Sequence, residues 1–287
     1  MKSFVSFGAL FAAIAFGLPQ FHYVTEPHQE LSKRIIGGDV APAGKYKFAS
    51  VVTLDIGGRT HTCAGTIISK NFIVTAGHCL VSGDGLTVNS PQNITAGYGS
   101  NESANQTFLT AKKLFLHPNY NPAVFENDIG IIQVADIPLD GVTSGKVPVY
   151  KGLLETTQVV TAIGWGMTDY TNWDSVSPSL KEAVVKVGNL STCKYQIETY
   201  LHSTFENSNG PRICIENALA PGNGPCAGDS GSPLVMFVNE MPYFAGVMSN
   251  GGGANGEATC AVTGGFAFYT HVKSYIPFIA NVTGLSL

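Results

Sequence analysis

The sequence predicts an all-β protein built from closed or sandwiched antiparallel sheets. Only 13% of its 287 residues are charged, while 33 are glycine, a composition that suits many turns and few long exposed helices. Short runs rich in β-branched and aromatic residues follow one another, with turn residues between them. The first half of the chain has no stretch of useful length with helical periodicity. A chain of this length can bury a large core in one or two subdomains.

The expected elements can be placed along the chain. Gly57-Gly58 between two runs predicts a tight hairpin. Apolar residues from about Ser274 to Val282 predict a short terminal helix, in which Pro277 fits only the first turn and Ser274 is the expected N-cap. The runs interpreted as strands are Ala49–Asp55, Thr66–Ser69, Phe72–Thr75, Asn93–Ala96, Phe108–Leu116 and Ile129–Val134.

The N-terminal residues, 1–17, have the pattern of a secretory signal peptide. Lys2 supplies a positive end, Phe4–Phe16 a short apolar run and Ala13-Ile14-Ala15 a small-residue cleavage site. The alternative, a transmembrane anchor, needs about 20 apolar residues, and this run is shorter. We therefore expect a secreted, extracellular protein without a membrane anchor. Its six cysteines suit such an oxidising compartment.

Charge and loop composition argue against two classes of binding protein. The formal net charge is −4 and the chain has no basic cluster, so nucleic-acid binding has no electrostatic support. The Gly-rich run Gly251–Gly256 has neither the Lys-Ser/Thr ending nor the following helix of a phosphate-binding loop. We therefore interpret it as an ordinary loop and expect no nucleotide cofactor.

One octapeptide, Cys226–Pro233, has the composition of a nucleophile loop. Ser230 lies between Gly228-Asp229 and Gly231. A serine hydroxyl is a poor nucleophile without a positioned base. Neighbouring glycines let the backbone turn sharply and direct amides at one point, where they would stabilise negative charge growing on a carbonyl oxygen. The octapeptide alone is equally compatible with a Gly-rich surface turn.

Two further segments supply a candidate base and a candidate acid. His78 lies in Thr75–Cys79, and Asp128 precedes the apolar run Ile129–Ile132. An acid at the start of a buried strand needs a partner to be tolerated there. The alternatives are an ordinary loop histidine and an aspartate that caps a strand.

The three segments together resemble the sequence boxes of the chymotrypsin/trypsin-type secreted serine endopeptidases. Their order along the chain, His, Asp and then Ser, is that of the chymotrypsin type, and the resemblance covers Ile35 to about Ile279. It implies two antiparallel six-stranded β-barrels, a short C-terminal helix and an active site in the cleft between the barrels. The barrels would span about residues 35–140 and 141–287 of a single protease domain, 35–287.

The resemblance also implies a role for each box residue. Ser230 attacks the peptide carbonyl, His78 accepts its proton and returns it to the leaving amine, and Asp128 orients His78. The backbone amides of Gly228 and Ser230 hold the oxyanion, and water then hydrolyses the acyl-enzyme. The mechanism uses no metal ion and no cofactor, and its partner is a protein or peptide substrate.

Residues 18–34 are interpreted as an activation propeptide. They end in Lys33-Arg34, directly before Ile35-Ile36-Gly37-Gly38, where members of the family are cut. The resemblance implies that the new ammonium group of Ile35 pairs with the carboxylate of Asp229, because a buried pair is tolerated far better than a lone buried charge. A trypsin-like protease or a dibasic processing enzyme would each suit Arg34. The alternative is a charged spot on the surface.

The resemblance pairs all six cysteines, as Cys63–Cys79, Cys193–Cys214 and Cys226–Cys260. The even count leaves no spare thiol, which argues against a cysteine nucleophile or a zinc site.

The predicted substrate pocket departs from that of relatives that cut after Lys or Arg. Those relatives have an aspartate two residues before the cysteine of the serine box, and Gly224 occupies that position here. A buried lysine side chain without a counter-charge is strongly disfavoured. We therefore expect an apolar residue before the cut (the P1 residue), in a slot that Ala267 makes shallower. The expected substrate-binding residues are Gly224, Ser249, Asn250, Gly251 and Ala267.

Glycans and calcium are the remaining ligands to consider. In the loop near residues 100–107, which holds calcium in several relatives, Glu102 is the only acid, so we expect no metal there. Five sequons are candidate glycosylation sites, at Asn93, Asn101, Asn105, Asn189 and Asn281.

Two other functions were weighed. A non-catalytic binding or inhibitor protein on the same scaffold typically lacks a triad residue, and none is missing here. A lipase-like esterase would carry Gly-x-Ser-x-Gly between a strand and a helix and have its histidine last in the chain, whereas His78 comes first. We expect a monomeric serine endopeptidase.

Overall fold

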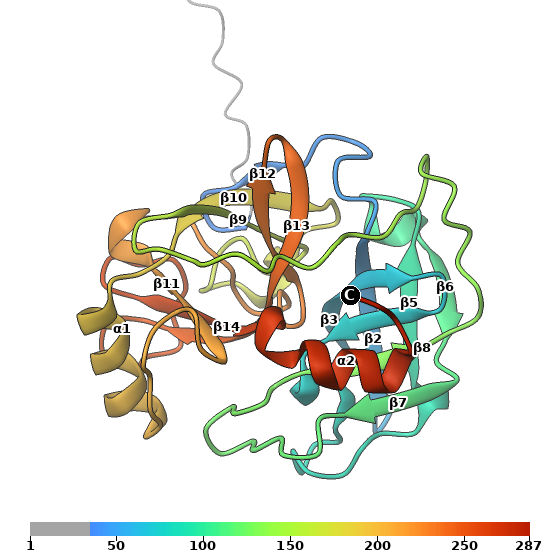
Figure 1. Cartoon of the computed structure of the whole chain (residues 1–287), viewed down its shortest axis with the longest axis horizontal. Coiled ribbons are helices and arrows are strands. Elements are labelled where there is room, and N and C mark those ends of the chain that lie inside the picture. The colour runs from blue at the N-terminus through green and yellow to red at the C-terminus, as the bar shows by residue number, and fades with distance from the viewer. Residues whose placement is uncertain (1–34) are drawn as a thin grey trace, which may run out of the picture. The chain divides into compact units, whose positions relative to one another are not determined.

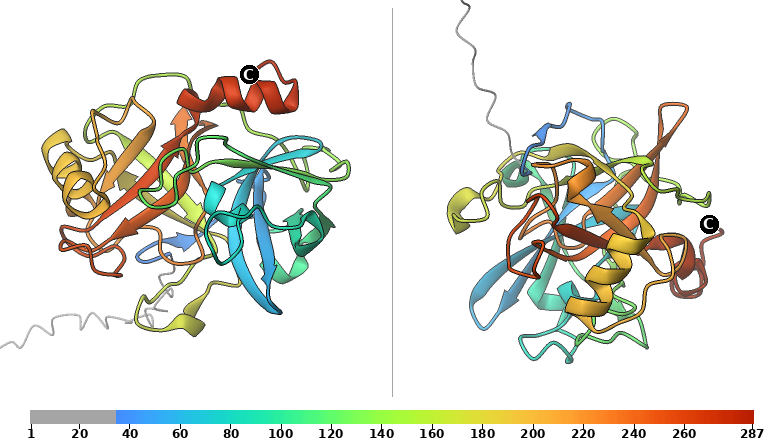
Figure 2. Two further views of the ribbon diagram at one scale, coloured as in Figure 1. Left: turned by 90° about the horizontal axis from the view of Figure 1, so that it is seen from below. Right: turned by 90° about the vertical axis from the view of Figure 1, so that its left-hand side faces the viewer.

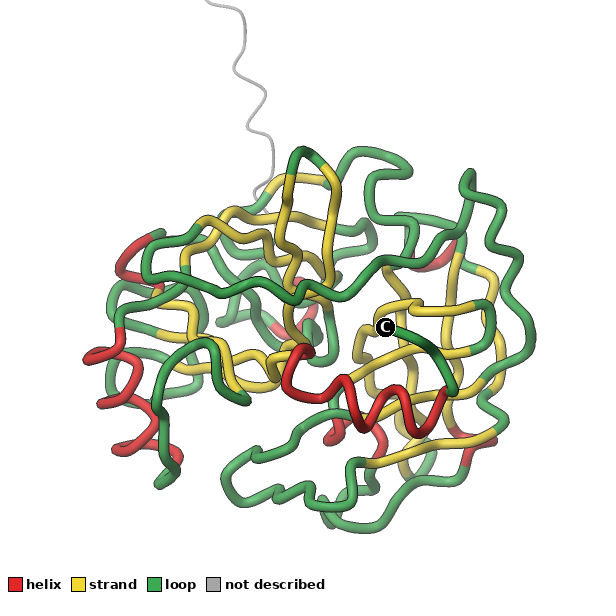
Figure 3. Tube along the Cα trace, viewed as in Figure 1, coloured by secondary structure: helices red, strands yellow, loops and turns green. Residues whose placement is uncertain are grey.

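The computed structural model describes residues 35–287, with the side chain of Ala218 left out. The predicted signal peptide (1–17), the propeptide (18–34) and the cleavage residue Arg34 lie outside these residues. Two antiparallel sheets of seven strands each dominate the structure (Figure 1), and helices are few (Figure 3). The predicted all-β fold is therefore confirmed. No helix within 35–287 combines the length and apolar character needed to cross a membrane.

The first sheet closes on itself through one bent segment. Its strand order is β6-β5-β2-β3-β4-β8-β7, so β6 and β7 are consecutive in the chain but lie at opposite edges. Between them, the Ala111 amide donates to the Ile94 carbonyl at 2.9 Å and the Lys112 amide to the Gln133 carbonyl at 2.7 Å. The run predicted as a single strand, Phe108–Leu116, thus pairs on both sides, and counting it once gives the expected six strands. The strands are β2 (Ala49–Ile56), β3 (Arg59–Ser69), β4 (Phe72–Thr75), β5 (Ile94–Tyr98), β6 (Thr107–Thr110), β7 (Lys113–Leu116) and β8 (Gly130–Gln133).

The second sheet has a short extra strand at one edge. Its order is β1-β10-β9-β12-β13-β14-β11, and a bridge between Val187 and Ile215 joins the end of β10 to β11. The other six strands therefore form a closed set, and β1 pairs outside it with Lys181 and Glu182. The strands are β1 (Asp39–Val40), β9 (Val159–Gly164), β10 (Lys181–Lys186), β11 (Arg212–Glu216), β12 (Pro233–Val238), β13 (Met241–Gly252) and β14 (Phe266–His271).

One hydrophobic core extends from the first sheet to strands of the second. Val52 and Ile73 of the first sheet belong to the same buried cluster as Val235, Phe244 and Val247 of the second. Fully burying such a side chain contributes about 1.5–3 kcal/mol. Because the two sheets share this core, the loops that leave them are held in a fixed relation.

Two α-helices lie outside the sheets. α1 (Leu190–Gln196) is capped by the Asn189 side chain, which accepts from the Thr192 amide at 2.9 Å, and a π-helical turn, Ile197–Leu201, continues it. α2 (Ile276–Thr283) packs against the core of the first sheet (Figures 1 and 2) although it follows the last strand of the second.

The expected N-cap of α2 was wrong. The 3₁₀ turn Val272–Tyr275 precedes α2, and Tyr275 occupies the N-cap position. The Ser274 hydroxyl instead donates to the Gly210 carbonyl at 2.9 Å. This bond ties the start of the helix to the loop before β11.

Candidate active site

His78 is held by a short turn between two strands. The 3₁₀ turn Gly77–Leu80 follows β4, and the Cys63–Cys79 disulfide ties this turn to β3. The side chain of His78 is 23% exposed, so one face of the ring reaches solvent. The ring of Phe125 meets it edge-on, with centroids 5.9 Å apart. The disulfides Cys193–Cys214 and Cys226–Cys260 are also present, which gives the same three pairs that the resemblance implied.

Asp128 lies completely buried against His78. Its Oδ2 is 2.8 Å from Nδ1 of the ring, and its Oδ1 accepts from the His78 amide, also at 2.8 Å. The Ser249 hydroxyl donates to Oδ2 at 2.6 Å, and the Thr270 hydroxyl donates to the Asp128 carbonyl at 2.7 Å. A carboxylate beside Nδ1 keeps the proton on that nitrogen and leaves Nε2 as an acceptor. The arrangement therefore orients the ring as a general base requires.

The two groups shift each other's pKa in opposite directions. Burial lowers the pKa of His78, but the attraction and hydrogen bond of the Asp128 carboxylate outweigh it and leave the pKa above its usual 6.5. Burial raises the pKa of Asp128, but His78 and the hydrogen bonds from Ser249 and the His78 amide leave it below its ordinary value. Each pKa therefore favours the charged state of its group, and the pair is tolerated in the interior.

Ser230 lies against the histidine segment. Its carbonyl accepts from the Ala64 amide at 2.7 Å. A Cβ atom on the next residue, Gly231, would lie 3.1 Å from the Ala76 amide and would overlap the Thr75 hydroxyl. Only glycine permits this close approach, at a backbone φ of 81°. The Ser230 hydroxyl makes no hydrogen bond to another described residue, His78 included. Such contacts are often long in free enzymes and tighten when substrate binds.

The turn before Ser230 buries a second carboxylate, that of Asp229. It accepts from the Gly166 amide at 2.8 Å and from the Cys226 amide at 2.9 Å. Burial raises its pKa to about 7, although these two hydrogen bonds oppose the shift. A Cβ on Gly166 would lie 2.5 Å from the carboxylate, and one on Gly164 would overlap it. The Gly164-Trp165-Gly166 motif therefore makes room for this carboxylate.

The segment that follows the predicted cleavage point lies beside the same region. Ile35 is completely buried, and Ile36 forms an antiparallel bridge with Gly224, whose amide donates to the Ile36 carbonyl at 3.0 Å. Gly37 (φ 75°) has no space for a side chain beside Gly222. Within residues 35–287, no ion pair involves Asp229.

A cavity of about 250 Å³ opens beside Ser230. The predicted pocket residues Ser249, Asn250 and Gly251 line it, and no lining residue carries a charge. Gly224 and Ala267 do not line it. Gly224 is bonded to Ile36, and Ala267 pairs across the sheet with Ile215 and Gly251.

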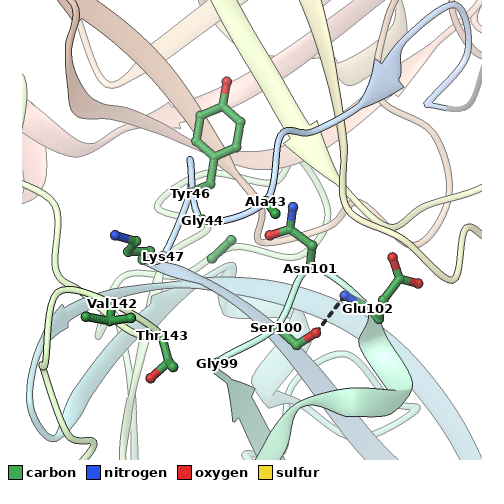
Figure 4. A pocket seen from close by; sticks show the side chains of 11 residues that line it. Ala43, Gly44, Tyr46, Lys47, Gly99, Ser100, Asn101, Glu102, Val142 and Thr143 are labelled. Carbon is green, nitrogen blue, oxygen red and sulfur yellow. Dashed lines mark hydrogen bonds between the residues drawn. The ribbon is translucent and has the colours of Figure 1, made fainter.

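A second cavity, of about 310 Å³, contains no residue of the three boxes (Figure 4). Its lining includes Lys47, Asn101 and Glu102. The Asn101 amide group donates to the Ala41 carbonyl at 2.9 Å, and the Glu102 carboxylate accepts from the Ser179 hydroxyl at 2.8 Å. The Lys47 ammonium group donates to the Gly141 carbonyl at 2.5 Å, so all three of these polar side chains are already partnered within the protein.

One group of possible metal ligands includes His78. Donor atoms of Cys63, His78 and Cys79 lie within 4.8 Å of one another. Both sulfur atoms are joined in a disulfide, and metal binding requires free thiolates. These three residues therefore do not form a metal centre.

Several neighbours of the site were not predicted from the sequence. Phe125 contacts His78, and Trp173 lines the cavity with Met167 and Tyr170. Ser249 was predicted to bind substrate, but its hydrogen bond to Asp128 was not predicted. The other residues lie in loops, where the sequence holds no periodic signal.

Known proteins resemble this chain along most of its length. A family model described as Trypsin matches residues 35–279. Chymotrypsin-2 of Vespa crabro is 31% identical over 248 residues, which cover 85% of this chain and 98% of that protein. Chymotrypsin-like elastase family member 1 of Homo sapiens is 28% identical over 280 residues, covering 91% and 97%. Trypsin of Phaedon cochleariae is 29% identical over 180 residues, covering 61% and 65%. Since the family model spans nearly all described residues, the chain belongs to the trypsin family of serine proteases.

Proposed function

We propose that the protein is a secreted serine endopeptidase that works through an acyl-enzyme. Ser230 attacks the peptide carbonyl while Nε2 of His78 accepts the hydroxyl proton, which His78 then gives to the leaving amine. Asp128 holds His78 in the required tautomer and stabilises its charged form. The amides of Gly228 and Ser230 stabilise the oxyanion. Water hydrolyses the acyl-enzyme by the same proton transfers in reverse.

The observation that carries this proposal is the contact between Nδ1 of His78 and Oδ2 of Asp128, at 2.8 Å. The carboxylate is completely buried, and such a group is tolerated only with a partner. The nucleophile loop packs against the same segment through Gly231. Because the pKa of His78 is raised above 6.5, the rate is expected to rise with pH in a range above that value, as the ring loses its proton.

We infer that activation follows cleavage after Arg34 by another protease. The freed ammonium group of Ile35 would pair with Asp229 and so stabilise the turn that carries the oxyanion amides. Two observations support this inference. Ile35 is buried and the next residue is bonded to Gly224, two positions before Cys226. The Asp229 carboxylate is buried without a cation among the described residues.

The proposed P1 preference is apolar rather than Lys or Arg. The cavity beside Ser230 has no charged lining residue, and a buried cation without a counter-charge is strongly disfavoured. Ser249, Asn250 and Gly251 would contact the substrate directly. Gly224 and Ala267 would act from behind the lining, through the position of the strands and loops that carry it.

We further propose that the protein leaves the cell and acts as a monomer. All six cysteines are paired in disulfides, as expected in an oxidising compartment. Secretion of the chain from expressing cells, with loss of residues 1–17, and its mass by light scattering would test the two statements separately.

One experiment tests the enzymatic proposal. The purified chain is cleaved after Arg34 and treated with a fluorophosphonate probe, with Ser230→Ala as the matched control. We expect labelling at Ser230 in the cleaved wild type, much slower labelling before cleavage, and none in the variant. A folded, correctly cleaved wild type that resists the probe would contradict the proposal and favour a non-catalytic protein on this scaffold.

A further inference from the structure

The loop between β9 and β10 presents an exposed tryptophan at the mouth of the cavity. The side chain of Trp173 is 77% exposed and that of Tyr170 is 38% exposed. Both line the cavity that also contains Ser230. Large aromatic residues dominate interface energetics when they are buried, so an aromatic pair left in water beside a nucleophile indicates a surface that a ligand covers. Within residues 35–287, no ring contact involves Trp173.

Hydrogen bonds fix the base of this loop to the nucleophile segment. The Met167 amide donates to the Ala227 carbonyl at 2.8 Å, three residues before Ser230. Met167 and Val176 form a bridge that closes the loop, and the Thr168 hydroxyl donates to the Ser175 carbonyl at 2.9 Å. The tip forms a short turn, Trp173–Ser175, which projects from the body of the protein (Figure 2). The position of Trp173 is therefore built into the fold.

Small residues share the lining of this cavity with the aromatic ones. Ala227, Gly251 and Gly252 line the same cavity as Trp173 and Tyr170. The side chain of Ala227 is a single methyl group, so it leaves room that a larger side chain would fill.

We propose that Trp173 and Tyr170 form an aromatic wall of the P1 pocket, which selects substrates with a large aromatic P1 side chain. This inference rests on the proposed function of the site and narrows its apolar preference. The aromatic P1 side chain of the substrate enters between Gly251–Gly252 and the indole, and covers the exposed face of Trp173. Neither aromatic residue takes part in bond making, so both are specificity residues.

The first test measures kcat/KM for peptides that differ only at P1, carrying Phe, Leu or Ala, with the residues after the cut unchanged. We expect Trp173→Ala to lower the ratio of Phe to Leu cleavage roughly 3- to 10-fold, the range of an aromatic pair, mainly through KM. Trp173→Phe should keep most of the preference. Leu153→Ala, which removes an apolar side chain that is 65% exposed and does not line the cavity, is the matched control.

The second test uses the tryptophan itself as a reporter of binding. The chain has two tryptophans, and Trp165 is 2% exposed, with its indole donating to the Asn101 carbonyl at 2.7 Å. In cleaved Ser230→Ala, a peptide with Phe at P1 should shift the emission to the blue and protect it from acrylamide quenching. The same peptide should leave the emission of Ser230→Ala/Trp173→Phe unchanged.

The outcomes separate this inference from the proposed function. An unchanged Phe-to-Leu ratio in Trp173→Ala, in a preparation that the fluorophosphonate labels, would overturn the aromatic wall and leave the enzyme intact. A ratio that changes only when the residue after the cut is varied would also overturn it. Failure of the probe on the wild type would refute the proposed function, and the fluorescence of the Ser230→Ala protein would still decide whether Trp173 is covered. In an Ala227→Met background, Trp173→Ala should have a smaller effect, because the longer side chain already fills part of the cavity that Trp173 lines.

Discussion

Asp128 and Asp229 are two completely buried carboxylates beside the same serine, and their pKa values shift in opposite directions. Burial disfavours the charged form of both carboxylates and so raises both pKa values. Asp128 lies against the His78 ring and accepts a hydroxyl hydrogen bond, so its pKa is lowered. Asp229 has two backbone amides and no cation among the described residues, so its pKa is raised to about 7. A positive partner, more than the depth of burial, decides whether a carboxylate here is charged.

The comparison suggests two uses for buried carboxylates. The partner of Asp128 is built into the fold and is present at all times. The proposed partner of Asp229 is made by a cut in the chain. A partner that is always present suits a residue needed in every catalytic cycle. A partner made by cleavage suits a residue that switches activity on.

The largest expected effect comes from Asp128→Asn in the cleaved protein. An amide cannot stabilise the charged imidazole, and it favours the wrong ring tautomer, so we expect kcat to fall about 10⁴-fold. The measurement is kcat on a peptide substrate, with circular dichroism as the control for folding. If the folded variant kept near-wild-type activity, His78 would not depend on this carboxylate.

Asp229→Asn should act differently before and after cleavage. In the cleaved protein it leaves the Ile35 ammonium group without a counter-charge, a loss of about 3–5 kcal/mol, so we expect the fraction of molecules that an active-site titrant labels to fall roughly 10²- to 10⁴-fold. In the uncleaved chain the same change removes an unpaired buried acid, and the free energy of unfolding in urea at pH 8 should stay equal or rise. Equal damage to both forms would contradict the switch.

A smaller effect is expected from Ser249→Ala. The variant loses a charge-assisted hydrogen bond to Asp128, worth about 1.5–3 kcal/mol, so kcat should fall at least about tenfold and the pKa of Asp128 should rise. Thr270→Val is the matched control, because it removes a neutral bond to the backbone of the same residue and should cost about 1 kcal/mol of stability. Similar kcat values for the two variants would argue against a special role for the bond to the carboxylate.

The smallest effects, counted per pH unit, are the changes with pH in the free energy of unfolding of the uncleaved chain. The pKa of Asp229 is raised from 3.8 to about 7, so the folded protein binds more protons than the unfolded one in that window. The stabilisation that the protonated Asp229 gives the folded protein is therefore complete below pH 3.8 and is lost as pH rises to about 7. His271, whose Nδ1 lies 2.9 Å from the Gly210 carbonyl oxygen, changes the free energy of unfolding in the opposite sense. Burial lowers the pKa of its ring from 6.5 to about 4. The stabilisation that the neutral His271 ring gives the folded protein is complete above pH 6.5 and is lost as pH falls to about 4.

The two slopes can be separated by subtraction. The difference in unfolding free energy between wild type and Asp229→Asn, followed from pH 4 to 7, isolates the aspartate, and its slope is expected to approach 1.4 kcal/mol per pH unit at most. His271→Gln isolates the histidine in the same way. A flat difference for Asp229→Asn would mean that this carboxylate is already ionised in the uncleaved chain.

The sequence predicted the parts of the site that depend on short, conformationally demanding segments. Gly231 of the serine box has a φ of 81° and lies against Thr75 and Ala76. Because only glycine fits there, the requirement is visible in the sequence. The β-branched runs likewise predicted the strands, including the bent one that closes the first sheet. The space that Gly164 and Gly166 leave for Asp229 is evident only from the structure.

The residues that could not be predicted depend on contacts between distant loops. Trp173 has no periodic neighbours, and its place beside the cavity follows from a hydrogen bond at the base of its loop, from the Met167 amide to the carbonyl of Ala227, which lies 60 positions further along the chain. Ala267 was expected to make the slot shallower because of its position in the family resemblance. Alternate residues of a strand face opposite sides, and its neighbour Phe266 lines the cavity while Ala267 does not. The N-cap of α2 shifted to Tyr275 because a 3₁₀ turn precedes the helix.

The two-residue strand β1 limits how far the chain end released by cleavage could travel. Asp39 and Val40 pair with β10, so only Ile35–Gly38 lie between a cut at Arg34 and this anchor, and Ile36 among them is bonded to Gly224. Four residues reach at most about 14 Å when fully extended. The new end would therefore act as a tethered ligand whose local concentration does not depend on how dilute the secreted protein becomes.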